Sequence, residues 1–565
     1  MAKARVASQA TLPTMVVFVA AILLPIAFLA AFFLFPVITL LSRGFIENNA
    51  LDLSGLTTVL SRPRTWLLFR NTIWQAVAGT VISTLLGIPI AYLLYRTRFA
   101  GQAAIRALVM VPFVLPTVVV GVAFRSLLRP GGLLAALNLD QTFGAVLLAL
   151  VFFNISVVVR TVGSLWERLD PRQEQAARAL GASPWRAFVT VTIPALGPAI
   201  AAAAALVALF CATAFGVVLV LGGAGYGTVE TEIYQRVADF LDLRGAAALS
   251  LLQLAVVAVA LTISQQARNR SERAISVTRA EAGTHPWRLR NPADAVTGAI
   301  TFLVVSALML LPLGSLVARS LQDGAGHWTL ANYRNLGSVA GSGGALIVPV
   351  TTALVMSLRT AALATAIALV IGLLLALVLS RQPKALWGRR AIAGFDALIM
   401  LPLGVSAVTV GFGFLITFTR PLFGVDLRVS GLLIPLAQAV VAVPLVVRTL
   451  LPVLRAINPR LRDAAATLGA SPLRVLRDVD LALVARPLGL ALGFAFAVSL
   501  GEFGATSFLA RPDAPTLPVV IFRLMSRPGQ ANFGMALAAS VILGVLAALV
   551  MLISERFRPP AVSAG

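Results

Sequence analysis

The feature that constrains this chain most is a series of long apolar runs separated by short polar segments. A helix needs about 20 predominantly apolar residues to cross the hydrocarbon core of a bilayer. Twelve runs of roughly that length occur, six in each half of the sequence. We therefore expect an all-α integral membrane protein with about 12 transmembrane helices. The runs lie near residues 15–41, 72–95, 104–128, 142–162, 193–222, 245–264, 296–318, 351–380, 391–417, 430–451, 484–510 and 533–553.

The charges orient these runs. Only 12% of residues are charged, and the net charge is +23. The arginines lie between apolar runs and do not form a basic domain, which argues against a nucleic-acid partner and fits the Lys/Arg excess of cytoplasmic loops. Arg-rich loops alternate with poorer ones, so we expect a multi-pass protein of the bacterial inner membrane with both termini in the cytoplasm.

A polar sequence occurs twice in this apolar chain. The first copy is Gln175-Ala-Ala-Arg-Ala-Leu-Gly181-Ala-Ser-Pro-Trp, and 288 residues later stands Asp463-Ala-Ala-Ala-Thr-Leu-Gly469-Ala-Ser-Pro-Leu. Further matches at the same offset run from residue 157 to residue 234. A constant offset over that length indicates a duplication. Six spans repeated in one orientation predict two parallel halves related by a pseudo-twofold axis along the membrane normal.

Each copy predicts a helix, a glycine bend and a second helix. Asp170 can cap a helix whose first residue is Pro171, and Ser183 can cap one that begins at Pro184. Gly181 can end the first helix in the left-handed conformation. Both copies lie in Arg-rich loops, so we expect them in the cytoplasm, where a partner can reach them. The equivalent residues of the second copy are Asn458-Pro459, Gly469 and Ser471-Pro472.

In this form the repeated sequence resembles the EAA loop of permease subunits of binding-protein-dependent ABC importers. The family pattern is Glu-Ala-Ala, three residues and Gly, with an Ile-x-Pro or Leu-Pro ending further on, and the first copy ends in Ile193-Pro194. The resemblance extends from about residue 68 to residue 555. Two loops in one polypeptide resemble the fused permeases for thiamine and for ferric iron. The fold implied is that of a type I ABC importer permease.

The resemblance also implies what the loops do. Each would form coupling helices that sit in a groove of one of two ATPase subunits, while a solute-binding protein delivers thiamine or ferric iron to the outer face. This chain would hold no cofactor, and ATP-Mg would be bound by the partner ATPase. The chain divides into a first half at 1–264 with loop 170–186, a cytoplasmic linker at 265–294, and a second half at 295–565 with loop 458–477. The residues implied in ATPase coupling are Glu174, Gln175, Ala176, Ala177, Gly181, Asp463, Ala464, Ala465 and Gly469.

Two positions depart from the family pattern. The acid position holds Gln175, with Glu174 beside it, in the first copy and Asp463 in the second. Ala482 stands where the second ending would have proline. The first departure argues against one symmetric contact between an acid and an arginine at both loops.

The sequence contains no nucleotide-binding or catalytic motif that we can identify. Neither Lys3 nor Lys384 follows a glycine, so the Gly-Lys pair of a phosphate-binding loop is missing, and we expect ATP hydrolysis on partner subunits. His285 and His327 lie in different loops and Cys211 lies alone in an apolar run, so no metal site is expected. A membrane-bound enzyme would also need a nucleophile or paired carboxylates, which we do not find.

Two acidic regions could serve transport. Glu502 lies inside the eleventh run, where an ionisable residue is costly and therefore a functional candidate. It is our candidate for the translocation path, since a carboxylate suits a cation such as thiamine. The alternatives are a position beside a water-filled cleft and a pair with an arginine. The predicted outer loop at 230–242 carries Glu230, Glu232 and Asp239, which could pair with a binding protein or simply face solvent.

A twelve-helix secondary transporter driven by an ion gradient is the alternative function. It shares the layout of six plus six spans and needs carboxylates placed for ion coupling. In such a transporter the two repeated loops would have no binding partner.

Overall fold

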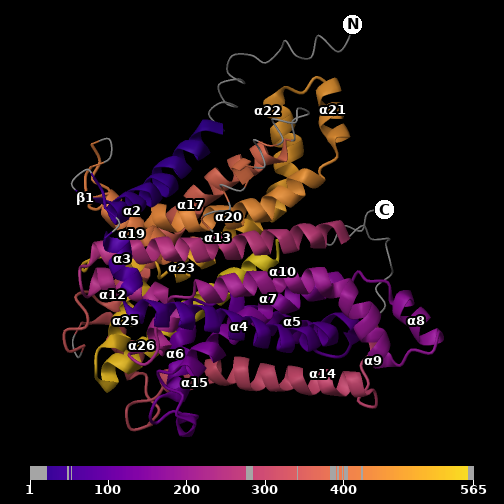
Figure 1. Ribbon diagram of the computed structural model, residues 1–565, viewed down its shortest axis with the longest axis horizontal. Coiled ribbons are helices and arrows are strands. Elements are labelled where there is room, and N and C mark those ends of the chain that lie inside the picture. The colour runs from indigo at the N-terminus through magenta and orange to yellow at the C-terminus, as the bar shows by residue number, and fades with distance from the viewer. Residues whose placement is uncertain are drawn as a thin grey trace. The chain divides into compact units, whose positions relative to one another are not determined.

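The computed structural model forms two compact units (Figure 1). Unit 1 comprises residues 1–42, 347–519 and 545–565, and unit 2 comprises residues 43–346 and 520–544. The residues that the structure describes are 22–47, 50–52, 54–274, 284–339, 342–381, 390, 394–396, 399, 402, 405–421 and 424–557.

Helices account for most of the described residues. In unit 2 they are α3 (Ser54–Ser61), α4 (Pro63–Arg96), α5 (Gln102–Met110), η4 (Val111–Phe113), α6 (Thr117–Leu128), η5 (Ala135–Leu137), α7 (Phe143–Trp166), α8 (Pro171–Ala179), α9 (Pro184–Ala187), η6 (Phe188–Thr192), α10 (Ile193–Ala212), α11 (Gly216–Leu221), α12 (Val229–Ala238), α13 (Leu243–Ala274), α14 (Pro292–Leu303), η7 (Val304–Leu310), α15 (Leu311–Ser320), α16 (Ala331–Arg334) and η8 (Asn335–Gly337). In unit 1 they are η3 (Ala30–Leu34), α17 (Val350–Ser380), α19 (Ala407–Thr417), α20 (Leu433–Ala456), α21 (Pro459–Thr467), α22 (Pro472–Val475), η9 (Leu476–Leu481), α23 (Ala482–Gly501) and α24 (Thr506–Leu509). Three helices have residues in both units: α2 (Phe35–Phe45), α25 (Leu517–Ser526) and α26 (Gln530–Glu555).

The strands are short. They are β1 (Ile46–Glu47), β2 (Ala50–Leu51), β3 (Thr97–Arg98) and β4 (His285–Pro286). The first two pair antiparallel, and the last two pair parallel, with Thr97 opposite His285.

The predicted fold class is confirmed. Ten helices within the described ranges are long and apolar enough to cross a membrane. The helices at Gln102–Phe113 and Thr117–Leu128 form a bent pair, at 104°, that could be one more span. Eleven of the twelve predicted runs therefore have a helical counterpart. The remaining run, 391–417, lies partly outside the described residues, and α19 forms its last part.

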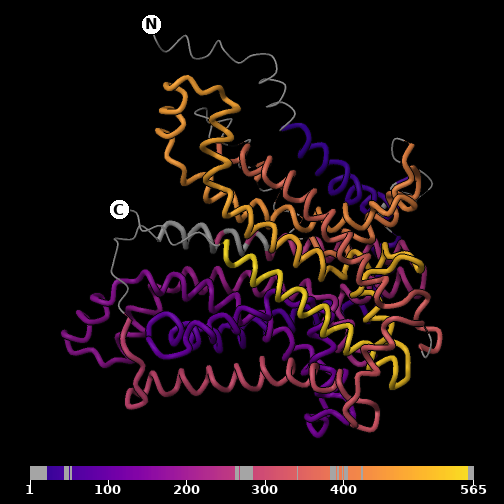
Figure 2. Tube along the Cα trace, turned by 180° about the vertical axis from the view of Figure 1, so that it is seen from behind, coloured from indigo at the N-terminus to yellow at the C-terminus, as the bar shows by residue number. Residues whose placement is uncertain are grey.

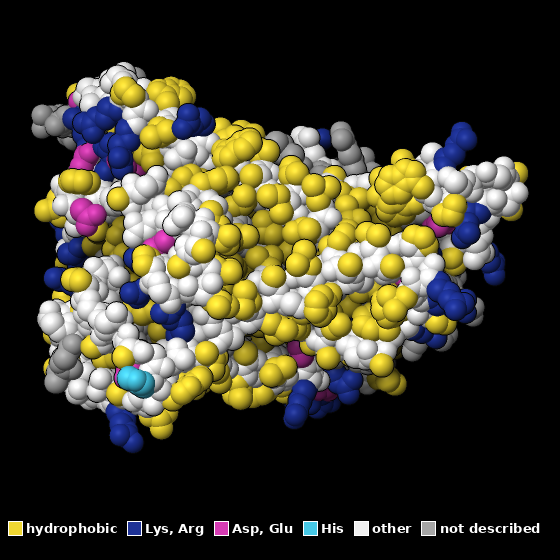
Figure 3. Space-filling view, turned by 90° about the horizontal axis from the view of Figure 1, so that it is seen from below, with side chains coloured by type: hydrophobic (Ala, Val, Ile, Leu, Met, Phe, Trp, Pro, Cys, Tyr) yellow, Lys and Arg dark blue, Asp and Glu magenta, His cyan; other side chains and the backbone are white. Residues whose placement is uncertain are grey.

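The outer surface of these helices is suited to lipid. Figure 3 shows one face of the molecule covered by hydrophobic side chains over its middle, with Lys and Arg gathered towards the ends. Phe302 is 75% exposed and Leu303 is 65% exposed, on a helix that the sequence predicts to span the membrane. A continuous apolar surface would drive a soluble protein to aggregate, whereas in a bilayer it is the solvated surface.

Small residues bring the central helices of each unit together. In unit 2, α4, α7 and α10 run side by side (Figures 1 and 2). A Cβ at Gly87 would lie 2.6 Å from Cγ1 of Val158, so α4 and α7 approach as closely as glycine allows. In unit 1 a Cβ at Gly372 would lie 2.6 Å from Cγ1 of Val446, which places α17 against α20 in the same way. Close approach through small residues is typical of helix packing in membranes.

The two units exchange their first helices relative to the sequence repeat. Residues 22–42 belong to unit 1, where the Phe32 ring lies 5.8 Å from the ring of Phe418. The first helix of the second half, α14 to α15, belongs to unit 2, where Asp294 accepts a hydrogen bond from the Tyr92 hydroxyl at 3.0 Å. Each compact unit therefore combines helices from both predicted halves, 1–264 and 295–565.

The duplication is visible in the backbone. Helix α8 and helix α21 have the same length and are separated by 288 residues, and so are α9 and α22. A π-helical segment, η6 or η9, follows in each copy at the same place. A π-helical turn is rare, so its occurrence at equivalent positions indicates that both copies keep one local structure.

Two polar segments differ from their predicted form. Of the linker 265–294, residues 265–274 continue α13 and residues 275–283 lie outside the described residues. The rest contains β4, an irregular segment at 287–291 and the start of α14. The outer segment expected to be a loop contains helix α12. Glu230 is fully buried in it, and Glu232 is 5% exposed. Glu232 accepts hydrogen bonds from Nε of Arg64 at 2.9 Å and from Nε of Arg236 at 3.2 Å. The expectation that these two glutamates face solvent or a binding protein is therefore wrong, because both are buried and Glu232 pairs with two arginines of the same unit.

Candidate functional site

The first loop, residues 170–186, folds as its sequence predicts. The Asp170 carboxylate accepts a hydrogen bond from the backbone N–H of Arg172 at 2.9 Å, and α8 begins at Pro171. The Ser183 hydroxyl accepts one from the N–H of Arg186 at 3.2 Å, at the start of α9. Side-chain caps of this kind satisfy N–H groups that a helix leaves without partners. Figure 2 shows this loop extending beyond the ends of the long helices of unit 2.

Gly181 makes the bend between the two short helices. Its φ of +89° lies in the left-handed region, which other residues enter at a cost. The N–H of Ala182 donates to the carbonyl of Ala177 at 3.1 Å, and the N–H of Gly181 donates to the carbonyl of Arg178 at 3.0 Å. These two bonds form a Schellman motif, which explains why the helix ends at this glycine.

The second loop, residues 458–477, repeats the arrangement. Asn458 and Ser471 accept hydrogen bonds from the N–H groups of Arg460 and Arg474, at 3.0 Å and 3.4 Å. Gly469 has a φ of +83°. The same pair of Schellman bonds is present, from Ala470 to Ala465 and from Gly469 to Ala466, both at 3.1 Å. The caps and bends predicted for both loops are thus confirmed.

Most of the predicted coupling residues lie on the surface of these loops. Gln175, Ala176 and Gly181 of the first loop are exposed, and so are Asp463, Ala464 and Gly469 of the second. Ala177 and Ala465 are half-buried, because their carbonyls accept the Schellman bonds on the inner side of the bend. The loops therefore present a small-residue surface that a partner could approach closely.

Two leucines belong to the same surface, and we did not predict them. Leu180 is 90% exposed, and Leu468, at the equivalent position, is 89% exposed. Trp185 is also 72% exposed. Burying a leucine stabilises a complex by about 1.5–3 kcal/mol, so a large apolar side chain held in water beside a rigid bend indicates a partner surface. The available sequence signal was an apolar residue directly before the glycine of a polar segment, in both copies.

The base of the first loop is tied to the long helices through Glu174. The Thr192 hydroxyl of η6 donates to the Glu174 carboxylate at 3.0 Å. Arg96, at the end of α4, interacts electrostatically with Glu174 and lines the same small cavity of about 20 Å³. Glu174 is half-buried, and the hydrogen bond that it accepts comes from Thr192 of the same chain.

The base of the second loop is also held to the long helices, but here the acid lies in the π-helical segment and the short helix supplies an arginine. Asp480 of η9 is completely buried and accepts a hydrogen bond from Nε of Arg462 at 2.7 Å. It accepts a second from Nη2 of Arg381, which follows α17, at 2.8 Å. Asp480 occupies the position of Thr192, and Arg462 occupies the position of Glu174, 288 residues apart in each case.

Glu502, the candidate for the translocation path, accepts several hydrogen bonds next to helix α24. Its carboxylate accepts from the N–H groups of Ala505 and Thr506, at 2.7 Å and 3.0 Å, and from the Thr506 hydroxyl at 2.9 Å. It is 7% exposed. These contacts give it a local role in holding the backbone turn after α23, and its place on the path stays a prediction.

Known proteins similar to this chain are permeases. The family model described as "Binding-protein-dependent transport system inner membrane component" matches residues 83–274. The thiamine transport system permease protein ThiP of Escherichia coli (strain K12) is 30% identical over 475 residues, which are 81% of this chain and 83% of that protein. The corresponding protein of Brucella abortus (strain 2308) is 29% identical over 511 residues, 87% of each chain.

A sulfate permease matches a shorter part. The sulfate transport system permease protein CysT of Escherichia coli (strain K12) is 32% identical over 206 residues, which are 35% of this chain and 74% of CysT. These matches agree with the membrane-spanning helices and with the duplicated, water-exposed loops. The chain therefore belongs to the binding-protein-dependent ABC transporter permeases of the inner membrane, as a fused member that resembles the thiamine permeases.

Proposed function

We propose that this chain is the permease of an ABC importer that moves thiamine into the cell, using ATP hydrolysed by separate subunits. The observation that carries the proposal is the 30% identity to a thiamine permease over 83% of that protein's length. The structure supports it with two capped, glycine-bent loops that expose leucines to water.

Each loop would engage one ATPase subunit. Leu180 and Leu468 would be buried in grooves of the two ATPases, with the alanines allowing close contact. The ATPases would bind ATP-Mg, and this chain would hold no cofactor. The Lys/Arg excess of these loops supports a cytoplasmic location for this surface and for both termini. A solute-binding protein would then deliver thiamine on the opposite side.

The connection of each loop to the membrane helices explains how a movement of the loop could be transmitted to them. In each copy the second short helix, α9 or α22, continues through η6 or η9 into a long membrane helix, α10 or α23. The bases of the loops are held by Glu174 and Thr192 in one copy and by Asp480 with two arginines in the other. ATP-driven approach of the two ATPases would move both loops, and the long helices with them, so that a central path opens alternately to each side.

The test uses the full transporter. The tagged chain is purified from the membranes of its own host, the ATPase and the binding protein that copurify are identified, and the complex is reconstituted in liposomes. We expect ATP-dependent accumulation of labelled thiamine that stops with a non-hydrolysable nucleotide. Accumulation of ferric iron and not of thiamine would show that the transported solute is ferric iron. Uptake driven by an ion gradient without ATP would refute the importer mechanism.

A further inference from the structure

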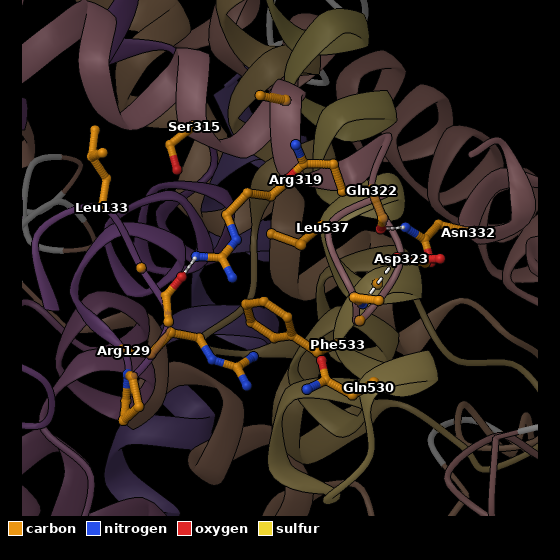
Figure 4. A pocket seen from close by; sticks show the side chains of 18 of the residues that line it. Arg129, Leu133, Ser315, Arg319, Gln322, Asp323, Asn332, Gln530, Phe533 and Leu537 are labelled. Atoms are coloured by element: carbon orange, nitrogen blue, oxygen red, sulfur yellow. Dashed lines mark hydrogen bonds between the residues drawn. The ribbon is translucent and has the colours of Figure 1, made fainter. Parts of the chain in front are cut away.

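Unit 2 contains a cavity of about 860 Å³ (Figure 4). It lies at the end of the helices opposite to the first loop, as the positions of α6 and α15 relative to α8 show (Figure 1). It lies between the end of α6, helix α15 and the start of α26, with the segments that follow α6 and α15 forming its rim. No role in coupling to an ATPase falls on this end of the unit. The cavity is large enough for a group of the size of a phosphate ester with a glycerol attached.

Two guanidinium groups lie on one side of this cavity. The Arg129 guanidinium lies 3.8 Å from the centre of the Phe533 ring, which fixes its plane. Nη1 of Arg319 donates to the carbonyls of Ser126 and Gly131, both at 2.8 Å, which fixes the second group. Figure 4 shows both guanidinium groups close to Phe533. Planar guanidinium groups held in place are well suited to binding the oxygens of a phosphate.

Positive charge exceeds negative charge around these two groups. The pKa of the Arg129 guanidinium lies below its ordinary value because the group is partly buried and lies near Arg319 and Arg125. Two carboxylates lie nearby. Asp140 lies 4.0 Å from Arg125 and also interacts electrostatically with Arg129, and Asp323, which lines the cavity, accepts hydrogen bonds from the N–H groups of Ala325 and His327, both at 2.9 Å. Three arginines therefore accompany two carboxylates in this region. An anion in the cavity would relieve the repulsion between the arginines.

The rest of the cavity lining contains side-chain amides and apolar side chains. Gln322, Asn332 and Gln530 contribute side-chain amides to the lining. Nδ2 of Asn332 donates to the carbonyls of Ser320 and Gln322, at 2.9 Å and 2.8 Å, and Figure 4 draws the second of these bonds. Phe533 and Leu537 supply apolar surface. Amides are suited to hydroxyl groups, which can both donate and accept hydrogen bonds.

An apolar track leads along α15 to this cavity. Leu311 and Ala318 line the cavity and lie on one face of the helix, seven residues apart. Leu310 and Val317, one position before each, are exposed at 49% and 47%. Because successive residues are rotated by about 100° around a helix, the exposed stripe runs beside the lining stripe. The stripe belongs to the helix Pro292–Ser320, which is apolar enough to span the membrane.

We propose that this cavity binds the headgroup of an anionic glycerophospholipid. Its phosphate lies between Arg129 and Arg319, its glycerol hydroxyls bond to the side-chain amides, and an acyl chain lies along Leu310 and Val317. With the first loop in the cytoplasm, this lipid belongs to the outer leaflet of the inner membrane. The bound lipid ties α6, α15 and α26 together at that end of the unit.

The test is native mass spectrometry of the purified transporter from nanodiscs that contain equal amounts of phosphatidylglycerol and phosphatidylethanolamine. We expect the wild-type chain to retain phosphatidylglycerol selectively. Arg129→Gln should retain about tenfold less, since it loses hydrogen bonds to a charged group, and Arg129→Lys should retain an intermediate amount because it keeps the charge. Arg334→Gln is the matched control, because Arg334 is exposed, lies on α16 after the same segment and does not line the cavity.

A second arm separates a lipid from a free anion. Inorganic phosphate at millimolar concentration should not displace the retained phosphatidylglycerol, since it lacks the acyl chain and the glycerol. Displacement by inorganic phosphate would show a free-anion site and overturn the proposal. Equal retention of both lipids by the wild-type chain, or unchanged retention in Arg129→Gln and Arg319→Gln, would overturn it as well.

Discussion

The two loops share one backbone and differ in the arrangement of charge at their bases. In the first loop the acid, Glu174, lies on the short helix, and its partner in the following π-helical segment is the hydroxyl of Thr192. In the second loop the acid, Asp480, lies in the π-helical segment, and the short helix supplies Arg462. The caps, the glycine bend and the Schellman bonds are the same in both.

This difference shows which features of the loop can change. The backbone depends on a capping oxygen, supplied by Asp170 in one copy and by Asn458 in the other, and on a glycine in the left-handed region, so both copies keep these two features. The contact at the base only needs to hold the short helix to the long ones, and an acid on either side can do this. The acid of the second loop is fully buried and bonds to two arginines, whereas Glu174 of the first loop is half-buried and accepts a hydrogen bond from the Thr192 hydroxyl. We infer that the two loops differ in stiffness.

The largest expected effect is at Asp480. Asp480→Ala leaves Arg462 and Arg381 without their shared counter-charge, and breaking a buried ion pair costs about 3–5 kcal/mol. We expect a large loss of thermal stability and of uptake, measured by thermal unfolding in detergent and by transport in liposomes. The double variant Asp480→Thr with Arg462→Glu copies the base of the first loop and should recover part of both.

Asp478 provides the control for this change. It lies in the same π-helical segment and pairs with Arg477, but it is exposed. Exposed ion pairs contribute about 0–1 kcal/mol, so Asp478→Ala should change stability little. Equal effects of the Asp478 and Asp480 variants would show that the buried pair does not hold the loop.

The exposed leucines should matter next most. Leu468→Ser and Leu180→Ser remove apolar surface that an ATPase would bury, and each should weaken the ATPase complex by about 1.5–3 kcal/mol. Copurification of the ATPase and its affinity for the purified chain measure this, while thermal unfolding of the chain alone should not change. Val429→Ser is the control, since Val429 is 71% exposed but lies between α19 and α20, away from the loops.

The glycine bends should respond equally, because their backbone is the same. Gly181→Ala and Gly469→Ala each force a residue with a Cβ into a positive φ, at a cost of about 1–2 kcal/mol. Both should reduce ATP-dependent uptake to a similar degree. Gly197→Ala is the control, since Gly197 lies inside α10 with open space around it, and alanine there should be neutral or stabilising. A large difference between the two bend variants would contradict a shared backbone role.

The sequence predicted the repeated local features of this molecule, such as caps and bends, better than the contacts between residues far apart in the chain. Caps at Asp170 and Ser183 and the bend at Gly181 depend on neighbouring residues, so they can be identified from local sequence. The exchange of the first helices between units depends on tertiary packing, which no local pattern encodes. The buried pairing of Glu232 with two arginines was missed for the same reason, because Arg64 is far away in sequence.

The smallest effect distinguishes two roles for Glu174. The family resemblance implies that Glu174 contacts the ATPase, whereas the structure gives it a partner inside the chain, Thr192, at 3.0 Å. If the internal bond is its main role, Thr192→Val should cost about 1 kcal/mol of stability, Glu174→Ala should cost about the same, and the double variant little more than either. If Glu174 contacts the ATPase, Glu174→Ala should lose ATPase binding while Thr192→Val keeps it. Measuring thermal unfolding and ATPase affinity for the three variants separates the roles, since a shared bond makes the stability costs non-additive and an ATPase contact does not.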